Sequence, residues 1–215
     1  MSKTAIVLGA TGLVGHHLLE EILQDESYEK VTLFSRSPIK KTHPKIEEHL
    51  IDLFNLENYC NEFKANDVFC CIGTTKSKSP DKKMYKKVDY GIPIDAAKLS
   101  GLNNIEKLLV VSAMGANRKS KVFYNRVKGQ MERDVQFYNS NETYIFKPSL
   151  IGGKRNESRV GETIAKAFFS VLNPILPKKI RSIHPQDIAK AMMHVAKTGY
   201  NSSKIPSDEI RMLAK

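Results

Sequence analysis

Three glycines near the N-terminus constrain the fold of this 215-residue chain more than any other feature. Gly9, Gly12 and Gly15 follow a continuous apolar run at residues 4–8 and precede apolar residues at helical spacing over residues 13–23. An uninterrupted apolar run is typical of a strand that is buried on both faces of a parallel sheet. A strand that leads through a glycine turn directly into a helix predicts the first βαβ unit of a Rossmann-type fold.

Each glycine of this turn has an expected role in holding a dinucleotide. Gly9 permits the tight turn, Gly12 lets the backbone approach a pyrophosphate, and Gly15 allows the helix to pack closely on the strand. The start of the helix offers unpaired N–H groups and a partial positive charge to the phosphates. The predicted cofactor contacts on this turn are Gly9, Thr11, Gly12, Leu13, Val14 and Gly15.

The next part of the chain alternates between strand-like and helical segments. Strands are expected at residues 30–34, 49–53, 67–72, 107–112 and 143–147, and helices at about 82–100 and 122–139. Such alternation predicts an α/β fold, a Rossmann-type doubly wound parallel sheet with helices on both faces.

The pattern changes after residue 149. Helices are expected near residues 161–172 and 185–197, and a last short strand at residues 209–213. We interpret the chain as a single domain with a small C-terminal helical cap. The cofactor part covers about residues 1–150, and the substrate or cap part covers about residues 151–215.

The end of the second strand distinguishes the two nicotinamide dinucleotides. An acidic residue there would bind the ribose 2′-hydroxyl, but the sequence reads Phe34-Ser35-Arg36-Ser37, with lysines close behind. The Arg36 guanidinium can make two hydrogen bonds to a 2′-phosphate. NADP(H) is therefore favoured over NAD(H), and the alternative is a solvated arginine.

Further cofactor contacts are predicted where later strands end. A carboxylate after the third strand can accept a hydrogen bond from the adenine, and a glycine after the fourth lets the backbone lie against a ribose. Ordinary turn chemistry is the alternative interpretation of both positions. The residues in this group are Asp52, Leu53, Gly73, Thr74, Thr75 and Pro148.

Tyr124 and Lys128 are four residues apart in a predicted helix, which places both on one face. A lysine ammonium close to a phenol favours the phenolate, so the pair is suited to proton exchange with a substrate oxygen. Lys128 is also expected to hold the nicotinamide ribose. Ser112, at the end of the preceding strand, is expected to hydrogen-bond the same substrate oxygen. Tyr85, Lys86 and Lys87 could line the cofactor cleft, but a charged helix face is the favoured interpretation.

With these motifs the chain resembles the atypical branch of the short-chain dehydrogenase/reductase superfamily. More narrowly, it is similar to the Tat-interacting-protein family of NADPH-binding proteins. That similarity is carried by residues 9–15, 31–33 with Arg36, 69–75, 88–89, 124–129 and 157–159.

The resemblance implies NADP(H) near Thr11, Gly12, Val14, Arg36, Tyr124 and Lys128, and a Ser-Tyr-Lys site at Ser112, Tyr124 and Lys128. The chain departs from the wider superfamily where related reductases place the serine one position later, here Ala113. It also has Lys147 where such proteins often have arginine, and it lacks most of the larger C-terminal substrate domain.

The net charge of +11 raises the question of a polyanionic partner. However, lysines are spread along the whole chain, and no predicted helix carries a basic stripe with interleaved aromatic residues. We interpret the charge as a solvated, lysine-rich surface that helps to attract phosphorylated ligands. No nucleic-acid partner is expected.

Location and redox state follow from simpler features. No apolar stretch approaches the roughly 18–20 residues of a membrane-spanning helix, and the N-terminus lacks a signal-peptide layout. We therefore expect no membrane span and a cytoplasmic location. Cys60, Cys70 and Cys71 are interpreted as reduced core residues, and no spacing of His or Cys suggests a metal site.

The leading hypothesis is an NADP(H)-dependent oxidoreductase that transfers hydride to or from a small carbonyl or alcohol substrate. The main alternative is a binding protein that senses NADP(H) and acts through protein partners without turnover. An isomerase or epimerase with bound NAD is disfavoured by Arg36. Phe168, Phe169 and Leu172 lie at helical spacing and form either a buried face or a homodimer contact.

Overall fold

The computed structural model describes the chain apart from residues 1, 75–78, 140–141 and 153–180. Its described strands form one seven-stranded sheet in the order β3-β2-β1-β4-β5-β6-β7, in which every neighbouring pair is parallel. The strands are β1 Lys3–Leu8, β2 Tyr28–Ser35, β3 Ile46–Leu50, β4 Asp67–Cys70, β5 Lys107–Val111, β6 Glu142–Lys147 and β7 Lys204–Pro206. The predicted doubly wound Rossmann-type sheet is confirmed.

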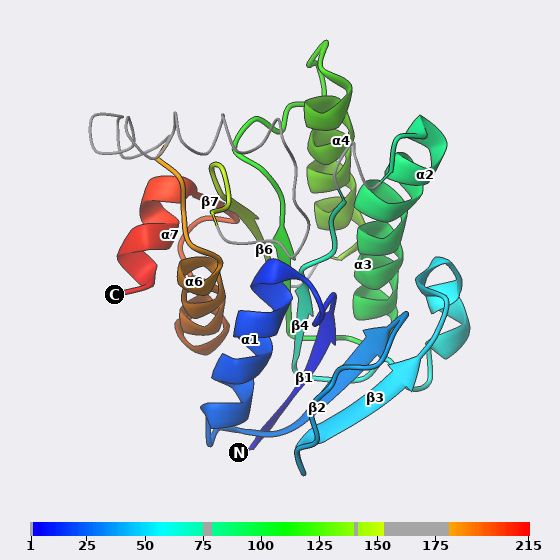
Figure 1. Cartoon of the computed structure of the whole chain (residues 1–215), viewed down its shortest axis with the longest axis vertical. Helices are drawn as coiled ribbons and strands as arrows, with labels where there is room; N and C mark the ends of the chain where they lie inside the picture. Colours follow the sequence, from blue (N-terminus) through cyan, green and yellow to red (C-terminus); the bar gives the residue numbers. More distant parts are fainter. Residues whose placement is uncertain (1, 75–78, 140–141, 153–180) are drawn as a thin grey trace.

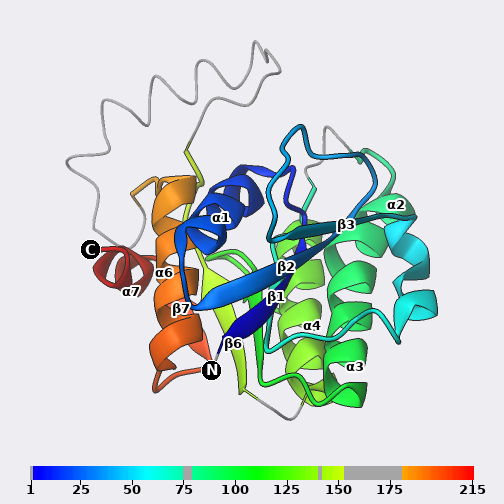
Figure 2. The same cartoon turned by 90° about the horizontal axis from the view of Figure 1, so that it is seen from below.

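The helices form a layer on each face of this sheet (Figures 1 and 2). One face is covered by α1 and α6, and the other by α3 and α4. The described helical elements are α1 Leu13–Gln24, the 3₁₀ helix η1 Leu53–Tyr59, α2 Lys82–Lys86, the π-helical turn η2 Lys87–Gly91, α3 Ile92–Leu102, α4 Phe123–Tyr138, α6 Pro185–Thr198 and α7 Ser207–Leu213. None of them is long and apolar enough to cross a membrane.

The strand β1 explains why the apolar run at the N-terminus is continuous. Ala5 and Val7 belong to the core beneath α1 and α6, whereas Ile6 and Leu8 belong to the core beneath α3 and α4. All four side chains are at most 1% exposed, so each face of the strand needs apolar residues. A strand with one solvent-exposed face would show alternating apolar and polar residues instead.

The C-terminal part of the chain joins the sheet itself. The helix α6 packs beside α1 in one core, and β7 pairs in parallel with β6 as the last strand. The predicted strand at residues 209–213 is wrong, because these residues lie in α7. Ile210 and Leu213 are three residues apart and pack on the α6 side of the sheet, a helical rather than an alternating spacing.

Other boundaries also differ from prediction. The third strand ends at Leu50 rather than at residue 53, because Asp52 already caps η1. The single helix expected at residues 82–100 is observed as α2, η2 and α3 in succession. The helix expected at residues 161–172, with Phe168, Phe169 and Leu172, lies outside the described residues, and so does Thr75.

Candidate functional site

The glycine turn between β1 and α1 has a geometry that other residues cannot adopt. Gly9 has φ +89°, in the left-handed region, and a Cβ there would lie 3.2 Å from the backbone of Cys71. A Cβ on Gly15 would lie 2.1 Å from the carbonyl oxygen of Gly9. The Gly12 N–H donates to that same carbonyl at 2.9 Å and closes the turn. The glycine spacing therefore reflects close backbone approach, as predicted.

The first turn of α1 is open to an anion. Gly12 caps the helix without a side chain, and no acidic residue lies in the first turn. Thr11 and Gly12 are exposed, Leu13 is half-buried, and Val14 is buried against the sheet. The N–H groups of a helix start that lacks a side-chain cap are suited to bind phosphate oxygens.

The end of β2 lies next to this turn. Leu8 pairs with Phe34, so the following residues, Gly9 and Ser35, are level with each other. Ser35 is 4% exposed, and its hydroxyl has no hydrogen-bond partner among the described residues. Arg36 follows it and is exposed. A buried hydroxyl without a partner is unfavourable unless a ligand or water satisfies it.

Asp52 and Leu53 have structural roles. The Asp52 carboxylate accepts hydrogen bonds from the Phe54 N–H at 3.0 Å and from the Asn55 side chain at 3.1 Å, and so it caps η1. Leu53 is 4% exposed and belongs to the core beneath α3. Asp52 therefore has a clear capping function. The adenine contact expected at these two residues stays a prediction.

Lys128 is the centre of a buried polar cluster at the carboxyl end of the sheet. Its Nζ lies 3.0 Å from Asp89 Oδ1 and donates to the Val111 carbonyl at 3.3 Å. The second Asp89 oxygen accepts the Thr74 N–H at 2.8 Å. A Cβ on Gly73 would lie 3.6 Å from Asp89 Oδ1 and 3.8 Å from Lys128 Nζ. Gly73 and Thr74, predicted from one strand end, and Lys128, predicted from a helix, are thus brought together.

The charge state of Lys128 follows from this cluster. Burial opposes the ammonium form, but attraction to the Asp89 carboxylate and to the ionised form of Tyr124 outweighs it, and the pKa of Lys128 is raised. The lysine is therefore a cation at neutral pH. Asp89 comes from η2, and a π-helical turn within a helix is frequent at functional sites.

Tyr124 lies one helical turn before Lys128 on α4 and is 37% exposed. Its ring meets the ring of Tyr85 edge-on, with 5.9 Å between centroids. Tyr85 is 4% exposed, so its predicted place on a charged helix face is wrong. Its hydroxyl has no hydrogen-bond partner among the residues that the structure describes. Lys82, Lys83 and Lys86 are exposed around it, whereas the single aromatic residue of α2 turns inward.

Ser112 lies at the end of β5 but faces a different partner. Its hydroxyl donates to Glu132 Oε1 at 2.6 Å, and both Glu132 oxygens contact Lys147 Nζ, at 2.8 and 2.7 Å. Ser112 and Glu132 are buried, and Lys147 is mostly buried. While the hydroxyl donates to Glu132, it can meet a further oxygen atom only as an acceptor. Sequence reasoning did not find Glu132, which is one of two acids on α4.

Pro148 ends β6 beside this network. Its carbonyl accepts the Met114 N–H at 2.9 Å and so joins the loop after β5 to the end of β6. On the other side of that loop, a Cβ on Gly129 would lie 2.2 Å from the backbone nitrogen of Arg118. The loop of residues 113–122 is therefore held closely against α4, next to Tyr124.

Comparisons with known proteins agree with this geometry. A family model described as NAD(P)H-binding matches residues 9–198. Protein HTATIP2 of Rattus norvegicus is 31% identical over 175 residues, which cover 80% of this chain and 72% of that protein. The mitochondrial protein FMP52-1 of Scheffersomyces stipitis is 34% identical over 161 residues, with 73% of this chain and 70% of that protein covered.

Solved structures share the fold at low sequence identity. A UDP-N-acetylglucosamine 4-epimerase from Methanobrevibacter ruminantium has a TM-score of 0.73 at 18% identity, covering 95% of this chain and 76% of its own. The UDP-glucose 4-epimerase of Thermotoga maritima has a TM-score of 0.71 at 14% identity, covering 92% of this chain and 74% of its own. At these identities the likeness concerns the fold alone.

One prediction is wrong in the light of the relatives. The cytoplasmic location was a default based on the lack of a signal-peptide layout, but several fungal relatives are named as mitochondrial proteins.

The family model and the relatives extend over most of the chain and include the glycine turn. The chain is therefore a member of the atypical short-chain dehydrogenase/reductase type of NAD(P)H-binding, oxidoreductase-like proteins.

Proposed function

We propose that this protein is an NADP(H)-dependent oxidoreductase that interconverts a small carbonyl compound and its alcohol. The observation that carries the proposal is the pair formed by Tyr124 and Lys128. The two residues lie one turn apart on α4, with the lysine buried in an ion pair and the tyrosine open to solvent. A buried cation beside an accessible phenol is suited to general acid–base chemistry.

The residues at the carboxyl end of the sheet fit a dinucleotide. The turn at Gly9 and Gly15 has no room for a Cβ, and the start of α1 has no side-chain cap. The partnerless Ser35 hydroxyl and the exposed Arg36 supply a donor and a cation where a 2′-phosphate would be bound. This pair of residues supports the preference for NADP(H) over NAD(H).

When bound, NADPH supplies the hydride, and the chain must supply the accompanying proton. Tyr124 gives its phenolic proton to the substrate oxygen in the reducing direction and takes it back in the oxidising direction. Lys128 stabilises the phenolate that remains, and Asp89 keeps Lys128 protonated and fixed in place. While the Ser112 hydroxyl donates to Glu132, it can accept a hydrogen bond from the hydroxyl of an alcohol substrate but cannot donate one to a carbonyl oxygen.

The proposal is tested with Tyr124→Phe, which removes the proton donor and keeps the ring. We expect a loss of turnover of about 10²–10⁴-fold across a panel of carbonyl substrates, with NADPH affinity within a few-fold of the parent protein. Tyr138→Phe is the matched control, because Tyr138 is an exposed tyrosine at the far end of the same helix. Equal turnover in the parent and the Tyr124 variant would rule out the mechanism.

The same measurements test the alternative of an NADP(H) sensor. If calorimetry shows tight NADPH binding by the parent protein and no carbonyl in the panel oxidises the cofactor, the sensor becomes the better account. In that case a partner that binds only in the presence of cofactor is expected in pull-down experiments.

A further inference from the structure

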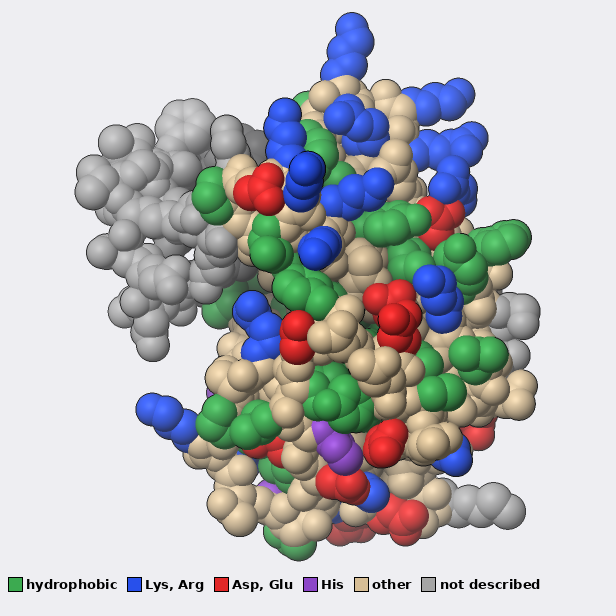
Figure 3. Space-filling model, turned by 90° about the vertical axis from the view of Figure 1, so that its right-hand side faces the viewer, with side chains coloured by type: hydrophobic (Ala, Val, Ile, Leu, Met, Phe, Trp, Pro, Cys, Tyr) green, Lys and Arg blue, Asp and Glu red, His purple; other side chains and the backbone are tan. Residues whose placement is uncertain are grey.

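Basic residues crowd the edge of the molecule beside Tyr124. The segments at residues 79–88 and 113–126 contain eight basic residues and a single acid, Asp81, which caps α2. The basic residues are Lys82, Lys83, Lys86, Lys87, Arg118, Lys119, Lys121 and Arg126. Figure 3 shows Lys and Arg side chains gathered at this end of the molecule, and acidic side chains mostly elsewhere. We call this surface of α2, the loop of residues 113–122 and the start of α4 the basic rim.

The two segments of the basic rim form one continuous surface. Lys82 Nζ lies 5.8 Å from the centre of the Phe123 ring, and Arg126 packs against that ring at 5.9 Å. Tyr85 meets Phe123 edge-on at 5.8 Å. The positive charges of α2 and of α4 are thus held side by side around shared aromatic rings.

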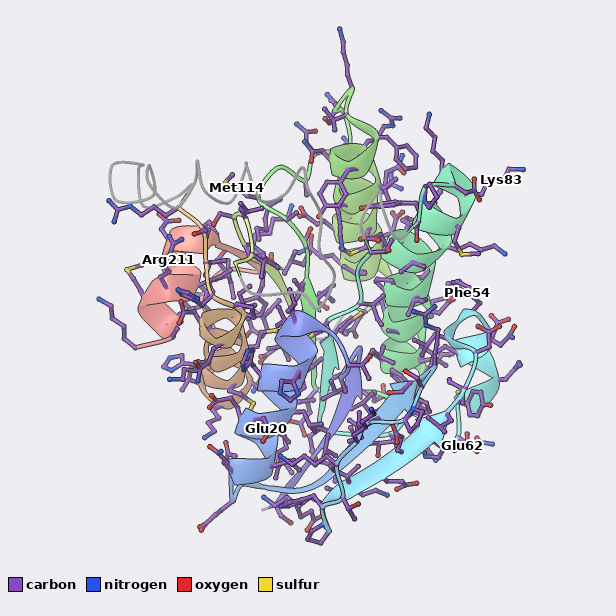
Figure 4. The ribbon with its side chains drawn as sticks, viewed as in Figure 1. Glu20, Phe54, Glu62, Lys83, Met114 and Arg211 are labelled. Carbon is purple, nitrogen blue, oxygen red and sulfur yellow. The ribbon has the colours of Figure 1, made fainter. Side chains whose placement is uncertain are left out.

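Exposed apolar side chains are concentrated on the same surface. The described residues include ten exposed large apolar side chains, and four of them lie in these two segments. They are Met84 (41% exposed), Met114 (46%), Val122 (58%) and Tyr124 (37%). In Figure 4, Lys83 points away from the outer end of α2, whereas Met114 lies across the view from it, on the side of α6 and α7. Apolar tips among cations are characteristic of proteins that lie on a membrane.

We infer that the basic rim docks this protein on an anionic lipid surface. The cations meet the phosphate headgroups, and the apolar side chains at Met84 and Val122 enter the boundary beneath them. A nucleic acid is a poorer fit, because single strands stack successive bases on several exposed aromatic rings, and of the three aromatic residues in the basic rim only Tyr124 is exposed. Tyr124, which belongs to the basic rim and is exposed, would then face the bilayer. This inference does not depend on turnover.

The test is sedimentation of the full chain with vesicles, without cofactor or substrate. The parent protein should bind mixed phosphatidylcholine–phosphatidylglycerol vesicles and not pure phosphatidylcholine, and added salt should release it. Replacing Lys83, Lys119 and Lys121 with Gln should weaken binding on the order of a hundred-fold, from about a five-fold loss per lysine. The charge-matched control replaces Lys64, Lys190 and Lys204, which are exposed on other elements.

A second variant separates lipid insertion from charge alone. Met84→Ser with Val122→Ser leaves the net charge unchanged and should weaken vesicle binding about ten-fold, because apolar area is no longer buried in the bilayer. Unchanged binding by this variant would overturn the insertion of Met84 and Val122, and a parent protein that does not bind the anionic vesicles would overturn the inference in favour of an acidic protein or polyanion. An equal loss in the control triple variant would overturn it in favour of adsorption driven by total charge.

Discussion

The buried pair of Lys147 and Glu132 gives the sharpest stability prediction. Lys147→Met keeps the length of the side chain but removes the ammonium that contacts both Glu132 oxygens, at 2.8 and 2.7 Å. The carboxylate is 3% exposed and would retain only the Ser112 hydroxyl among these partners. Breaking a buried ion pair costs about 3–5 kcal/mol, and we expect about 3 because the Lys147 side chain is 18% exposed.

The double variant distinguishes a buried unpaired charge from simple loss of packing. Lys147→Met with Glu132→Leu removes both charges, so its destabilisation should fall short of the sum of the two single variants by about 2 kcal/mol or more. The free energy of unfolding is measured with urea and circular dichroism, with the denaturant slope checked for constancy. Additive single effects, or a Lys147→Met loss under about 1 kcal/mol, would refute this reasoning.

Three further predictions concern the cofactor site and the acid stability of the fold. Arg36→Ala should weaken NADPH binding about 10–100-fold and leave NADH affinity nearly unchanged, as measured by calorimetry; equal losses for both would remove the 2′-phosphate contact. Gly15→Ala should lower the free energy of unfolding in urea by about 1–3 kcal/mol or more, because the added Cβ would lie 2.1 Å from the Gly9 carbonyl oxygen. Gly91→Ala is the control, because nothing lies within 4 Å of a Cβ at that position, and equal effects of the two substitutions would contradict the steric argument. Burial works against ionisation of Asp25, but hydrogen bonds from Lys197 and Ser27 outweigh it and hold the pKa of Asp25 below its ordinary value of 3.8. Its carboxylate therefore stabilises the fold above that pH and loses this effect as the pH falls through the folded pKa, so Asp25→Asn should cost about 0.5–1 kcal/mol at pH 7 and nothing in strong acid, and a constant difference at every pH would contradict the linkage.

Local spacing was enough to predict the parts of the site that lie on one element. The turn at Gly9 and Gly15 and the helical pair of Tyr124 and Lys128 each depend on residues that are close in the sequence. The local backbone of the turn or helix fixes how these residues lie relative to one another, so their spacing in the sequence is enough to predict their arrangement. The long buried strands were predictable for the same reason, because continuous apolar runs need no knowledge of their neighbours.

The parts that sequence reasoning missed are contacts between elements. Asp89 meets Lys128 from a different helix, and nothing in the lysine-rich segment before it indicates that one acid turns inward. Glu132 is distinguished from Asp134, the other acid of α4, only by Ser112 and Lys147, which lie at the ends of two different strands. Short elements were missed where one side chain decides the boundary, as Asp52 does by capping η1.

The order of the strands explains why these contacts meet at one place. β1 and β4 are neighbours in the sheet, but the chain leaves β1 toward α1 on one face and leaves β4 toward α3 on the other. A crevice forms where neighbouring strands send the chain in opposite directions. At its base the segments that follow β1 and β4 are in close contact, because a Cβ on Gly9 would lie 3.2 Å from the backbone of Cys71. Two residues later Gly73 reaches Asp89 and Lys128, so a dinucleotide held by the glycine turn must extend past Gly73 to reach Tyr124.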